Sequence, residues 1–254
     1  MTTHNAQGPD PRTIEIAGNI FELAPVPTDF RRDSLLERYW PLHPRYQFFK
    51  GVPPGARFLD IGAGSGGLSF WKEWGMPQRS DIQMYGVDLT VGKHAERYVE
   101  FHAINLDIDA LPFKDGFFDI VYASHLIEHV DHLKLFAEAR RVSKPGALMF
   151  LETPTPESKS APSCDAFIGS GYEASTLNFY DDSTHIDTLS LRYLKQTLGR
   201  FGFTVEHSGI IRFEALEPEL LSIGLQLHDK EILTFGLWSR FQFAEYVVAR
   251  RVSQ

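Results

Sequence analysis

The sequence contains a single cysteine, Cys164, among its 254 residues. A lone cysteine excludes an intrachain disulfide and fits a reducing compartment. The sequence also has no apolar run long enough to span a bilayer, and residues 1–11 are polar, without the apolar core of a signal peptide. These absences predict a soluble, cytoplasmic protein that does not bind to a membrane.

The chain has no excess of positive charge. Its 25 lysines and arginines stand against 33 aspartates and glutamates, which gives a formal net charge of −8. Broad binding to a phosphate backbone needs a basic surface, so the charge argues against nucleic acid as a partner, although it is compatible with a local basic groove. The length suits one α/β domain with embellishments and leaves the oligomeric state open.

The stretch RFLDIGAGSGGL, residues 57–68, carries the most specific pattern of the sequence. A short apolar run, typical of a buried strand, ends in closely spaced glycines, and residues 68–74 then have a helix-like pattern. Glycines at a strand-to-helix corner allow a tight turn and let a ligand approach main-chain N–H groups. Asp60 adds a carboxylate at the carboxyl end of the strand, where open α/β sheets bind ligands.

Three interpretations of this corner are open: two kinds of nucleotide-type ligand, and a glycine turn that binds nothing. The glycines satisfy G-x-G-x-x-G, a pattern of dinucleotide-binding corners that hold a pyrophosphate. With Asp60 they also satisfy D-x-G-x-G-x-G, which resembles the first motif of class I S-adenosylmethionine-dependent methyltransferases. A carboxylate would repel a pyrophosphate, whereas it would attract the ammonium and sulfonium end of S-adenosylmethionine.

Strand-like and helix-like segments alternate through most of the chain. Five strand-like segments between residues 57 and 152, mostly linked by helix-like ones, predict a mostly parallel sheet with helices on both faces. The front half of residues 241–249 alternates in the manner of an edge strand. The remaining expectations are a strand or hairpin over residues 13–23, helices over 34–40, 133–142 and 189–201, a turn at 143–146, a strand over 203–211, and mostly helical structure over 215–239.

A second acid stands where a nucleoside cofactor would need it. Asp88 ends the strand-like segment 83–89, which follows the glycine corner. A carboxylate at this strand tip can accept hydrogen bonds from both hydroxyls of a ribose, and Leu89 could pack on an adenine face. An acid can also occupy such a place as a turn or helix cap.

Together these patterns resemble the class I S-adenosylmethionine-dependent methyltransferase family over about residues 53–213 and the last strand. The resemblance implies a Rossmann-like α/β fold, whose seven-stranded, mostly parallel sheet has an antiparallel last strand. It implies S-adenosylmethionine as the cofactor, with Asp107 accepting from the adenine amino group and Ile108 lining the adenine. The cofactor-binding residues that we expect are Asp60, Gly62, Ala63, Gly64, Gly66, Asp88, Leu89, Asp107, Ile108 and Ser124.

Candidate catalytic groups follow the fourth strand-like segment. His125, Glu128, His129 and His132 are spaced as i, i+3, i+4 and i+7, which would place them on one face of a helix. Glu128 and His129 resemble a common Glu-His pair of the methyltransferase family, where such residues cap a helix or contact cofactor or substrate. His185 lies in the irregular stretch 153–185, and such stretches are usually functional or mobile.

Two metal-dependent interpretations of these residues are also open. With His185, the set resembles the acid and histidine ligands of metal-dependent methyltransferases, among them certain small-RNA terminal 2′-O-methyltransferases and quinone O-methyltransferases. Those families have a glutamate where this chain has His125. The letters H-x-x-E-H at residues 125–129 also fit the inverted zinc-peptidase motif. We assign no metal ligand from the sequence.

We expect a methyltransferase acting on a small molecule, at oxygen more readily than at nitrogen or carbon. His185 and His129 are the expected catalytic bases, and His125, Glu128 and Tyr180 are expected to contact the substrate. The alternatives are a cofactor-binding regulatory protein without catalysis, a metal-assisted 2′-O-methyltransferase of RNA, and an NAD-dependent dehydrogenase. Residues 1–50 are expected to form an extension with a helical cap, and residues 51–254 the cofactor-binding domain, with substrate-cover segments around 153–188 and 214–240.

Overall fold

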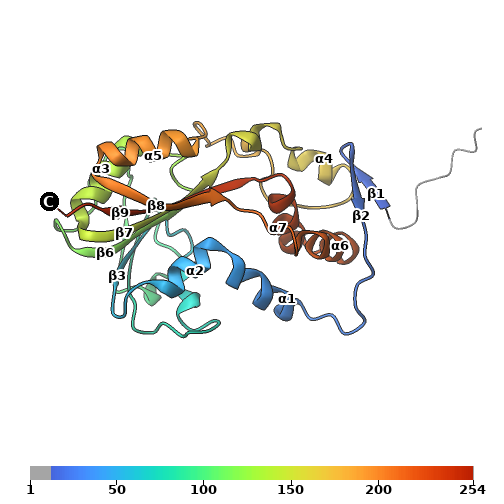
Figure 1. Cartoon of the computed structure of the whole chain (residues 1–254), viewed down its shortest axis with the longest axis horizontal. Helices are drawn as coiled ribbons and strands as arrows, with labels where there is room; N and C mark the ends of the chain where they lie inside the picture. The colour runs from blue at the N-terminus through green and yellow to red at the C-terminus, as the bar shows by residue number, and fades with distance from the viewer. Residues whose placement is uncertain (1–12, 254) are drawn as a thin grey trace, which may run out of the picture. The chain divides into compact units, whose positions relative to one another are not determined.

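The computed structural model describes residues 13–253 (Figure 1). They divide into two compact units. The larger unit contains residues 36–156, 184–211 and the chain from 244 onward, and the smaller one contains the described residues up to 35 together with 157–183 and 212–243. The expected domain boundaries, and the role of the two cover segments, stay predictions.

The larger unit is built on a seven-stranded sheet with the order β5-β4-β3-β6-β7-β9-β8. The first five of these strands run parallel to one another, and β9 runs antiparallel to both β7 and β8. This arrangement confirms the expected fold class. The strands are β3 (Arg57–Ile61), β4 (Gln83–Asp88), β5 (Glu100–Ala103), β6 (Phe118–Ser124), β7 (Ser143–Pro154), β8 (Phe203–Ile210) and β9 (Ala244–Arg251).

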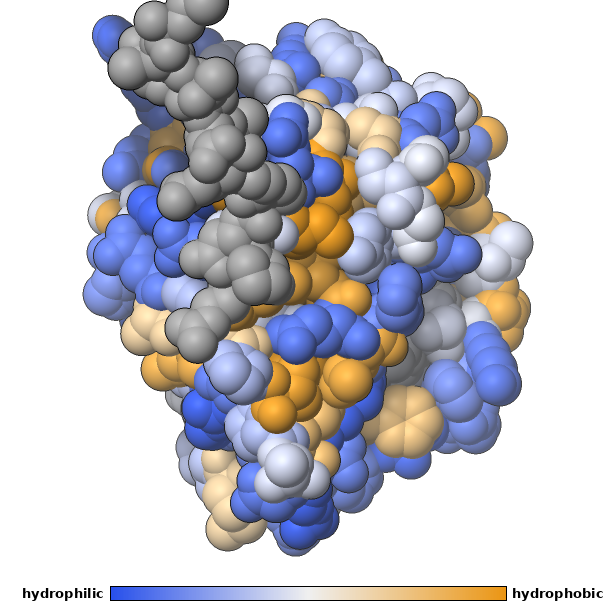
Figure 2. All heavy atoms as spheres, turned by 90° about the vertical axis from the view of Figure 1, so that its right-hand side faces the viewer, coloured by the Kyte–Doolittle hydropathy of each residue, from blue (hydrophilic) through white to orange (hydrophobic). Residues whose placement is uncertain are grey.

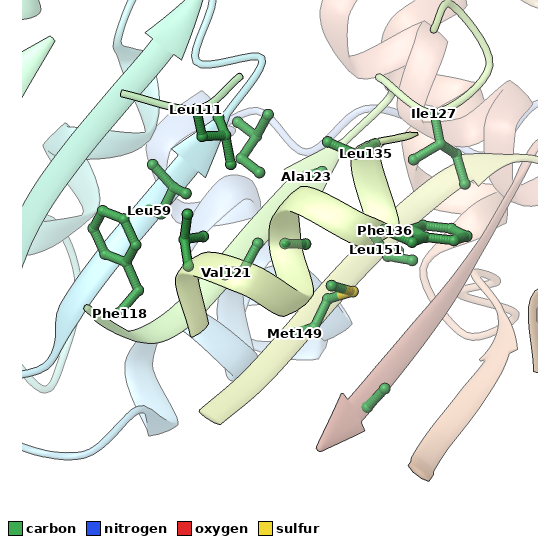
Figure 3. Packing of buried hydrophobic residues seen from close by; sticks show 14 of the residues in the cluster. Leu59, Leu111, Phe118, Val121, Ala123, Ile127, Leu135, Phe136, Met149 and Leu151 are labelled. Atoms are coloured by element: carbon green, nitrogen blue, oxygen red, sulfur yellow. The ribbon is translucent and has the colours of Figure 1, made fainter. Parts of the chain in front are cut away.

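Helices pack on both faces of this sheet, as the alternation of the strands requires. On one face, Leu59 of β3 and Val121 of β6 belong to the same buried cluster as Phe136 of α3 (His132–Val142), which Figure 3 shows. The same cluster includes apolar residues of α5 (Leu191–Arg200). On the other face, Phe58 packs with Phe49 of α2 (Pro44–Gly51). Consecutive residues of β3, Phe58 and Leu59, therefore pack in the hydrophobic clusters on opposite faces of the sheet.

The helix-like pattern expected after the glycine corner is confirmed as a 3₁₀ helix, η2 (Gly67–Lys72). Two other local expectations for the larger unit were wrong. The turn expected at residues 143–146 belongs to β7, which begins at Ser143. The strand expected at an edge, β9, lies between β7 and β8, and β8 is the edge. An alternating pattern of apolar residues indicates which face of a strand is buried. It does not indicate whether the strand has a hydrogen-bonded neighbour strand at one edge or at both.

The short elements between these strands are also defined. Helix α1 (Arg32–Tyr39) is followed by η1 (Trp40–Leu42), and η3 (Ala95–Arg97) precedes β5. Among residues 13–253, none of the helices combines the length and the apolar character that crossing a membrane requires.

The smaller unit contains the hairpin of β1 (Thr13–Ile16) and β2 (Asn19–Glu22), which confirms the expectation for residues 13–23. Ile16 and Phe21 of this hairpin pack in one cluster with apolar residues of α4 (Cys164–Ile168), α6 (Glu217–Leu227) and α7 (Lys230–Arg240). Two short 3₁₀ helices, η4 (Pro156–Ser160) and η5 (Phe179–Asp181), complete the elements. On the face that Figure 2 shows, hydrophobic side chains lie among hydrophilic ones.

Candidate active site

The glycine corner connects β3 to η2 through backbone that needs glycine. Gly62, Gly64 and Gly66 have φ angles of +73°, +52° and +83°, a region that side chains disfavour. Gly62 also donates its N–H to the carbonyl of Val87 on the neighbouring strand at 2.9 Å. A Cβ at Gly62 would lie 3.0 Å from Leu126, whereas a Cβ at Gly64 would meet none of the described residues within 4 Å. The turn therefore leaves open space above Gly64.

Asp88 lies at the end of β4, next to this turn. Its Oδ2 atom accepts the N–H of Gly64 at 2.8 Å, and its Oδ1 atom accepts the N–H of Leu89 at 2.7 Å. The Leu89 side chain is 69% exposed. The structure therefore brings the expected ribose-binding acid and the expected cofactor turn into direct contact, because β3 and β4 are adjacent parallel strands.

Asp107 and Ile108 follow β5 at the surface. The Oδ1 atom of Asp107 accepts the N–H of Asp131 at 2.9 Å, and Ile108 is 76% exposed. Asp131 is the N-cap residue of α3, so this contact ties the loop after β5 to the start of that helix. Neither residue is among those that line the cavity described next.

A cavity of about 350 Å³ lies beside the glycine turn. Five expected site residues line it, namely Asp60, Gly62, Ala63, Ser124 and His125. The other lining residues were not among the expected site residues; they are Trp40, Arg45, Gly67, Leu68, Trp71 and Tyr122, of which Gly67 and Leu68 belong to the glycine-rich stretch. No motif marks Arg45, because it reaches this place only through the packing of α2.

Asp60 is the buried acid of the cavity, with an exposed fraction of 2%. Its Oδ2 atom accepts the hydroxyl of Tyr98 at 2.7 Å. Burial raises the pKa of Asp60 to about 7, although the Tyr98 hydroxyl acts in the opposite direction. Asp60 is therefore poised to ionise fully when a cation approaches it.

Arg45 places a guanidinium in the same cavity. The group lies near two tryptophan rings, 5.3 Å from the centroid of Trp40 and 5.7 Å from that of Trp71. It donates through Nη1 to the Ser124 hydroxyl at 3.1 Å, and its Nε atom lies 3.7 Å from Glu152. These contacts come from four separate segments, so the tertiary structure holds the guanidinium in place.

His125 lies between two carboxylates whose side chains are fully buried. Its Nε2 atom lies 3.1 Å from Glu152, and its Nδ1 atom lies 3.4 Å from Glu128, a contact without hydrogen-bond geometry. Burial alone would lower the pKa of His125, but the two carboxylates raise it to about 9. His125 is therefore a cation at neutral pH, which makes it a poor general base.

The helical face expected for residues 125–132 was wrong. Residues 125–131 form a turn in which His125 has a φ of +51°, and α3 begins only at His132. The Asp131 side chain accepts the N–H groups of Leu133 and Lys134, so the helix is capped at that point. His132 instead contacts the Tyr193 hydroxyl at 2.8 Å.

Glu128, His129 and His185 nevertheless come together. Each offers one nitrogen or oxygen atom, and these atoms lie within 4.8 Å of one another, so the three residues could hold a metal ion. Two contacts join the segments that carry them: Thr184 Oγ1 lies 2.9 Å from His129 Nδ1, and the N–H of Ile186 donates to the carbonyl of Glu128 at 2.7 Å. His185 is therefore placed beside both expected partners.

Tyr180, an expected substrate contact, belongs to the smaller unit. Its side chain is 70% exposed, and its ring packs edge-on against Phe179 in η5. The role of Tyr180 in substrate binding stays a prediction.

The strand order, the glycine turn after β3 and the acids of β3 and β4 define a class I methyltransferase fold. Residues 33–208 match the model of the methyltransferase domain family. The chain therefore belongs to the methyltransferase domain family, whose members use S-adenosylmethionine. This confirms the family resemblance and favours S-adenosylmethionine over a dinucleotide at the glycine corner.

Curated relatives share only part of their length with this chain. One is the ubiquinone/menaquinone biosynthesis C-methyltransferase UbiE of Paraburkholderia xenovorans, 31% identical over 148 residues, which are 54% of this chain and 60% of that protein. Another is phosphoethanolamine N-methyltransferase 3 of Arabidopsis thaliana, 29% identical over 123 residues, which are 42% of this chain and 24% of that protein. The chain thus spans about a quarter to three fifths of these two proteins.

Solved structures agree with the fold. An S-adenosylmethionine-dependent methyltransferase of Mesorhizobium loti has a TM-score of 0.55 at 18% identity, covering 82% of this chain and 97% of that one. A geranyl diphosphate C-methyltransferase of Streptomyces coelicolor has a TM-score of 0.55 at 15% identity, covering 87% and 81%. At such identities the likeness concerns the fold alone.

The residues of this chain fit the cofactor. A side chain at Gly64 would enter open space, and the cavity beside the turn carries the carboxyl of Asp60 and the guanidinium of Arg45. S-adenosylmethionine offers an ammonium and a carboxylate, and the two side chains are complementary to these groups.

Proposed function

We propose that this chain is an S-adenosylmethionine-dependent methyltransferase that methylates a hydroxyl oxygen of a small molecule. One observation carries the proposal: the cofactor cavity adjoins a group of proton acceptors. Ser124 and His125 line the cavity, and the chain then turns directly to Glu128 and His129, which meet His185. A hydroxyl acceptor must lose its proton, and these imidazoles are the groups that can take it.

Different residues are expected to bind different groups of the cofactor. Asp60 is directed to the ammonium, the N–H groups of the glycine turn to the amino-acid portion, and Asp88 to the ribose hydroxyls. Leu89, Asp107 and Ile108 are the expected adenine contacts. When bound, the cofactor supplies a methyl group on a sulfonium, a leaving group that needs no further activation.

Positioning of the acceptor is then the main task of the protein. The acceptor oxygen forms a bond to the methyl carbon while the carbon–sulfur bond breaks, and the hydroxyl proton passes to His185 or His129. His125 is cationic through its two carboxylate neighbours, and we therefore assign it to holding Glu128 and Glu152 in place. We thus propose a positioning role for His125 in place of the expected substrate contact.

Two observations support a small molecule as the methyl acceptor: the net charge of the chain and the names of its curated relatives. The formal net charge of −8 disfavours an extended nucleic acid. The curated relatives named above are, by name, methyltransferases of quinone biosynthesis and of phosphoethanolamine. They transfer to carbon and nitrogen, so oxygen as the acceptor atom rests on the histidine group of this chain.

The test is turnover of labelled S-adenosylmethionine by the purified chain against a panel of hydroxylated metabolites, with amines and carbon acceptors as parallel arms. Label on a hydroxyl oxygen is the expected result. Cofactor binding without turnover in any arm would favour a regulatory protein. Absence of cofactor binding would overturn the proposal.

A second candidate function is metal-assisted O-methylation, favoured by the convergence of Glu128, His129 and His185. The Glu128 side chain is fully buried, and its Oε1 atom lies 3.4 Å from His125 Nδ1 but accepts no hydrogen bond from the residues that the structure describes. This oxygen therefore keeps lone pairs that a bound cation could take. The mixture of nitrogen and oxygen ligands suits Zn²⁺ or a similar ion better than Mg²⁺.

Such an ion would hold the acceptor oxygen beside the cofactor cavity and favour its ionised form. Zn²⁺ titration against a chromophoric chelator tests the site without any acceptor. We expect one equivalent to bind to the natural chain, with binding lost in Glu128→Gln and His185→Ala and kept in His207→Ala, which changes an exposed histidine of β8. Equal Zn²⁺ binding by all four proteins would exclude this candidate.

A further inference from the structure

A second cavity of the larger unit is lined by the turn that follows β6 and by the segment that leads into α5. Its volume is about 560 Å³, which falls within the range of small-molecule sites, about 300–1,000 Å³. None of the described residues lines both this cavity and the cofactor cavity. We call it the apolar cavity, because its lining includes the apolar side chains of Ile127, Val130, Pro156, Ile186 and Leu189.

One side of the apolar cavity belongs to the main hydrophobic core. Ile127 is 2% exposed and lies in the buried cluster that Figure 3 shows, and Val130 and Leu189 pack against that cluster. Ile186 lines the same cavity but is 69% exposed. A large aliphatic side chain exposed beside a preformed apolar cavity favours a binding site, because a ligand removes both surfaces from water.

The polar part of the lining carries little charge. Among the described residues that line the apolar cavity there is no lysine and no arginine. Burial lowers the pKa of His132, so its imidazole is uncharged at neutral pH, and its Nε2 atom lies 2.8 Å from the Tyr193 hydroxyl. Asp187 adds a carboxylate. A phosphate or carboxylate would therefore be repelled without meeting a cation, whereas an uncharged apolar compound loses no ionic hydration on entering.

The apolar cavity and the histidine group (Glu128, His129 and His185) come from the same two segments. Ile127 directly precedes Glu128, and Ile186 directly follows His185. The N–H of Ile186 donates to the carbonyl of Glu128 at 2.7 Å, which joins the two segments. A molecule in the apolar cavity therefore lies against the backbone that carries the expected catalytic bases.

We propose that the apolar cavity holds the skeleton of the methyl acceptor, and that the acceptor is therefore an uncharged alcohol with an aromatic or alicyclic skeleton. The inference rests on the proposed function, since it names the substrate class of the same reaction. The skeleton is bound by burial of apolar surface, while the hydroxyl is directed to His129 and His185. The walls of the cavity then orient the acceptor for transfer.

The first measurement uses two binding probes and needs no turnover. β-Naphthol is an uncharged aromatic alcohol, and β-naphthyl phosphate adds a negatively charged group to the same skeleton. In calorimetric titrations of the natural chain, β-naphthol should bind about tenfold more tightly or better. Ile186→Asp should weaken β-naphthol about tenfold, and Ile186→Leu should stay within about twofold. Ile20→Asp, at an exposed position of β2, is the matched control and should change neither affinity.

A change of charge at the same position guards against a merely unfolded variant. Ile186→Lys should weaken β-naphthol but strengthen β-naphthyl phosphate about fivefold, because an ammonium then meets the phosphate. Unfolding cannot raise the affinity for one of the two probes. Isotope-labelled histidine locates bound β-naphthol: the imidazole NMR signals of His129 and His185, assigned with alanine variants, should shift. Those of His207, on β8, should not.

Three results would show that the inference is wrong while the proposed function stands. They are no binding of β-naphthol or equal affinities for the two probes, full affinity for β-naphthol in Ile186→Asp, and unshifted signals of His129 and His185.

Turnover of labelled S-adenosylmethionine separates the inference from the function on which it rests. Methylation of uncharged aromatic or alicyclic alcohols ahead of sugars and phosphorylated alcohols would support the inference. Methylation confined to sugars or phosphorylated alcohols would overturn the inference alone. If no hydroxyl compound is methylated, the proposed function fails and the inference fails with it.

Discussion

Gly64 donates its backbone N–H to the carboxylate of Asp88 at 2.8 Å, which joins the turn after β3 to the end of β4. Gly64 belongs to the glycine-rich stretch 57–68, and Asp88 is the acid that ends the strand-like segment 83–89. The cofactor site was predicted from these two sequence patterns. Their contact means that Asp88 shapes the turn as well as facing the ligand, and a substitution there acts on both.

Asp88→Ala should weaken S-adenosylhomocysteine binding by about tenfold or more, because the ribose loses a charged acceptor. The free energy of unfolding should fall by only about 1 kcal/mol, since the N–H groups of Gly64 and Leu89 can turn to water at this partly exposed place. Calorimetry and thermal unfolding measure the two effects. Asp88→Asn, which keeps one acceptor oxygen, should be intermediate in both. Full affinity in Asp88→Ala would remove this residue from the cofactor site.

Cofactor binding should depend on pH through Asp60. Its pKa of about 7 is raised by burial, so the carboxyl of the free protein is largely protonated at pH 6. An ammonium is attracted only to the ionised form, so binding must release a proton below pH 7. The affinity for S-adenosylhomocysteine should therefore rise by up to about tenfold per pH unit below pH 7 and level off above it.

The matched variant is Asp60→Asn, which cannot titrate and should show a flat profile over that range. The same raised pKa affects the stability of the free protein. The neutral Asp60 carboxyl stabilises the fold fully below the unfolded pKa of about 4, and this contribution is lost as the pH rises toward 7. Identical pH profiles of binding in the natural chain and the variant would contradict the assignment of Asp60.

His185→Ala should lower kcat about 10²- to 10⁴-fold once an acceptor is known, which is the usual contribution of a general base. The affinity for S-adenosylhomocysteine should stay within about twofold, because His185 does not line the cofactor cavity. Steady-state rates and calorimetry check the two parts. His207→Ala serves as the control and should leave kcat unchanged. Undiminished turnover in His185→Ala would exclude His185 from the reaction.

Lys50 stabilises the end of η2 and the segment that follows it. The residue is 8% exposed, and its ammonium donates to the carbonyls of Trp71, Trp74 and Pro77 at 2.6, 2.7 and 2.8 Å. Lys50→Met preserves the length of the side chain but leaves these acceptors without their donor. We expect a loss of about 3 kcal/mol in the free energy of unfolding, measured in urea. Lys195→Met, at an exposed position of α5, should cost less than about 0.5 kcal/mol.

Local rules explain why the fold class could be predicted from residue order. Continuous apolar runs define strands that are buried on both faces, and such strands linked by helix-like segments form a parallel sheet. The glycine turn could be placed because Gly62 and Gly64 adopt φ angles that other residues disfavour. Asp60 and Asp88 could be placed because the carboxyl ends of adjacent parallel strands share one edge.

Long-range contacts decided what the sequence left open. The position of β9 inside the sheet depends on pairing with β7 and β8, which no pattern within β9 encodes. The start of α3 depends on the Asp131 cap, so the expected helical face before it did not form.

The site was completed in the same way. His185 reaches His129 through a segment more than fifty residues further along the chain, and Arg45 reaches the cofactor cavity from a helix that carries no site motif. Periodicity and turn chemistry are properties of neighbouring residues and can be read from the chain. The meeting of distant side chains depends on how whole elements pack, and that is settled only in the folded protein.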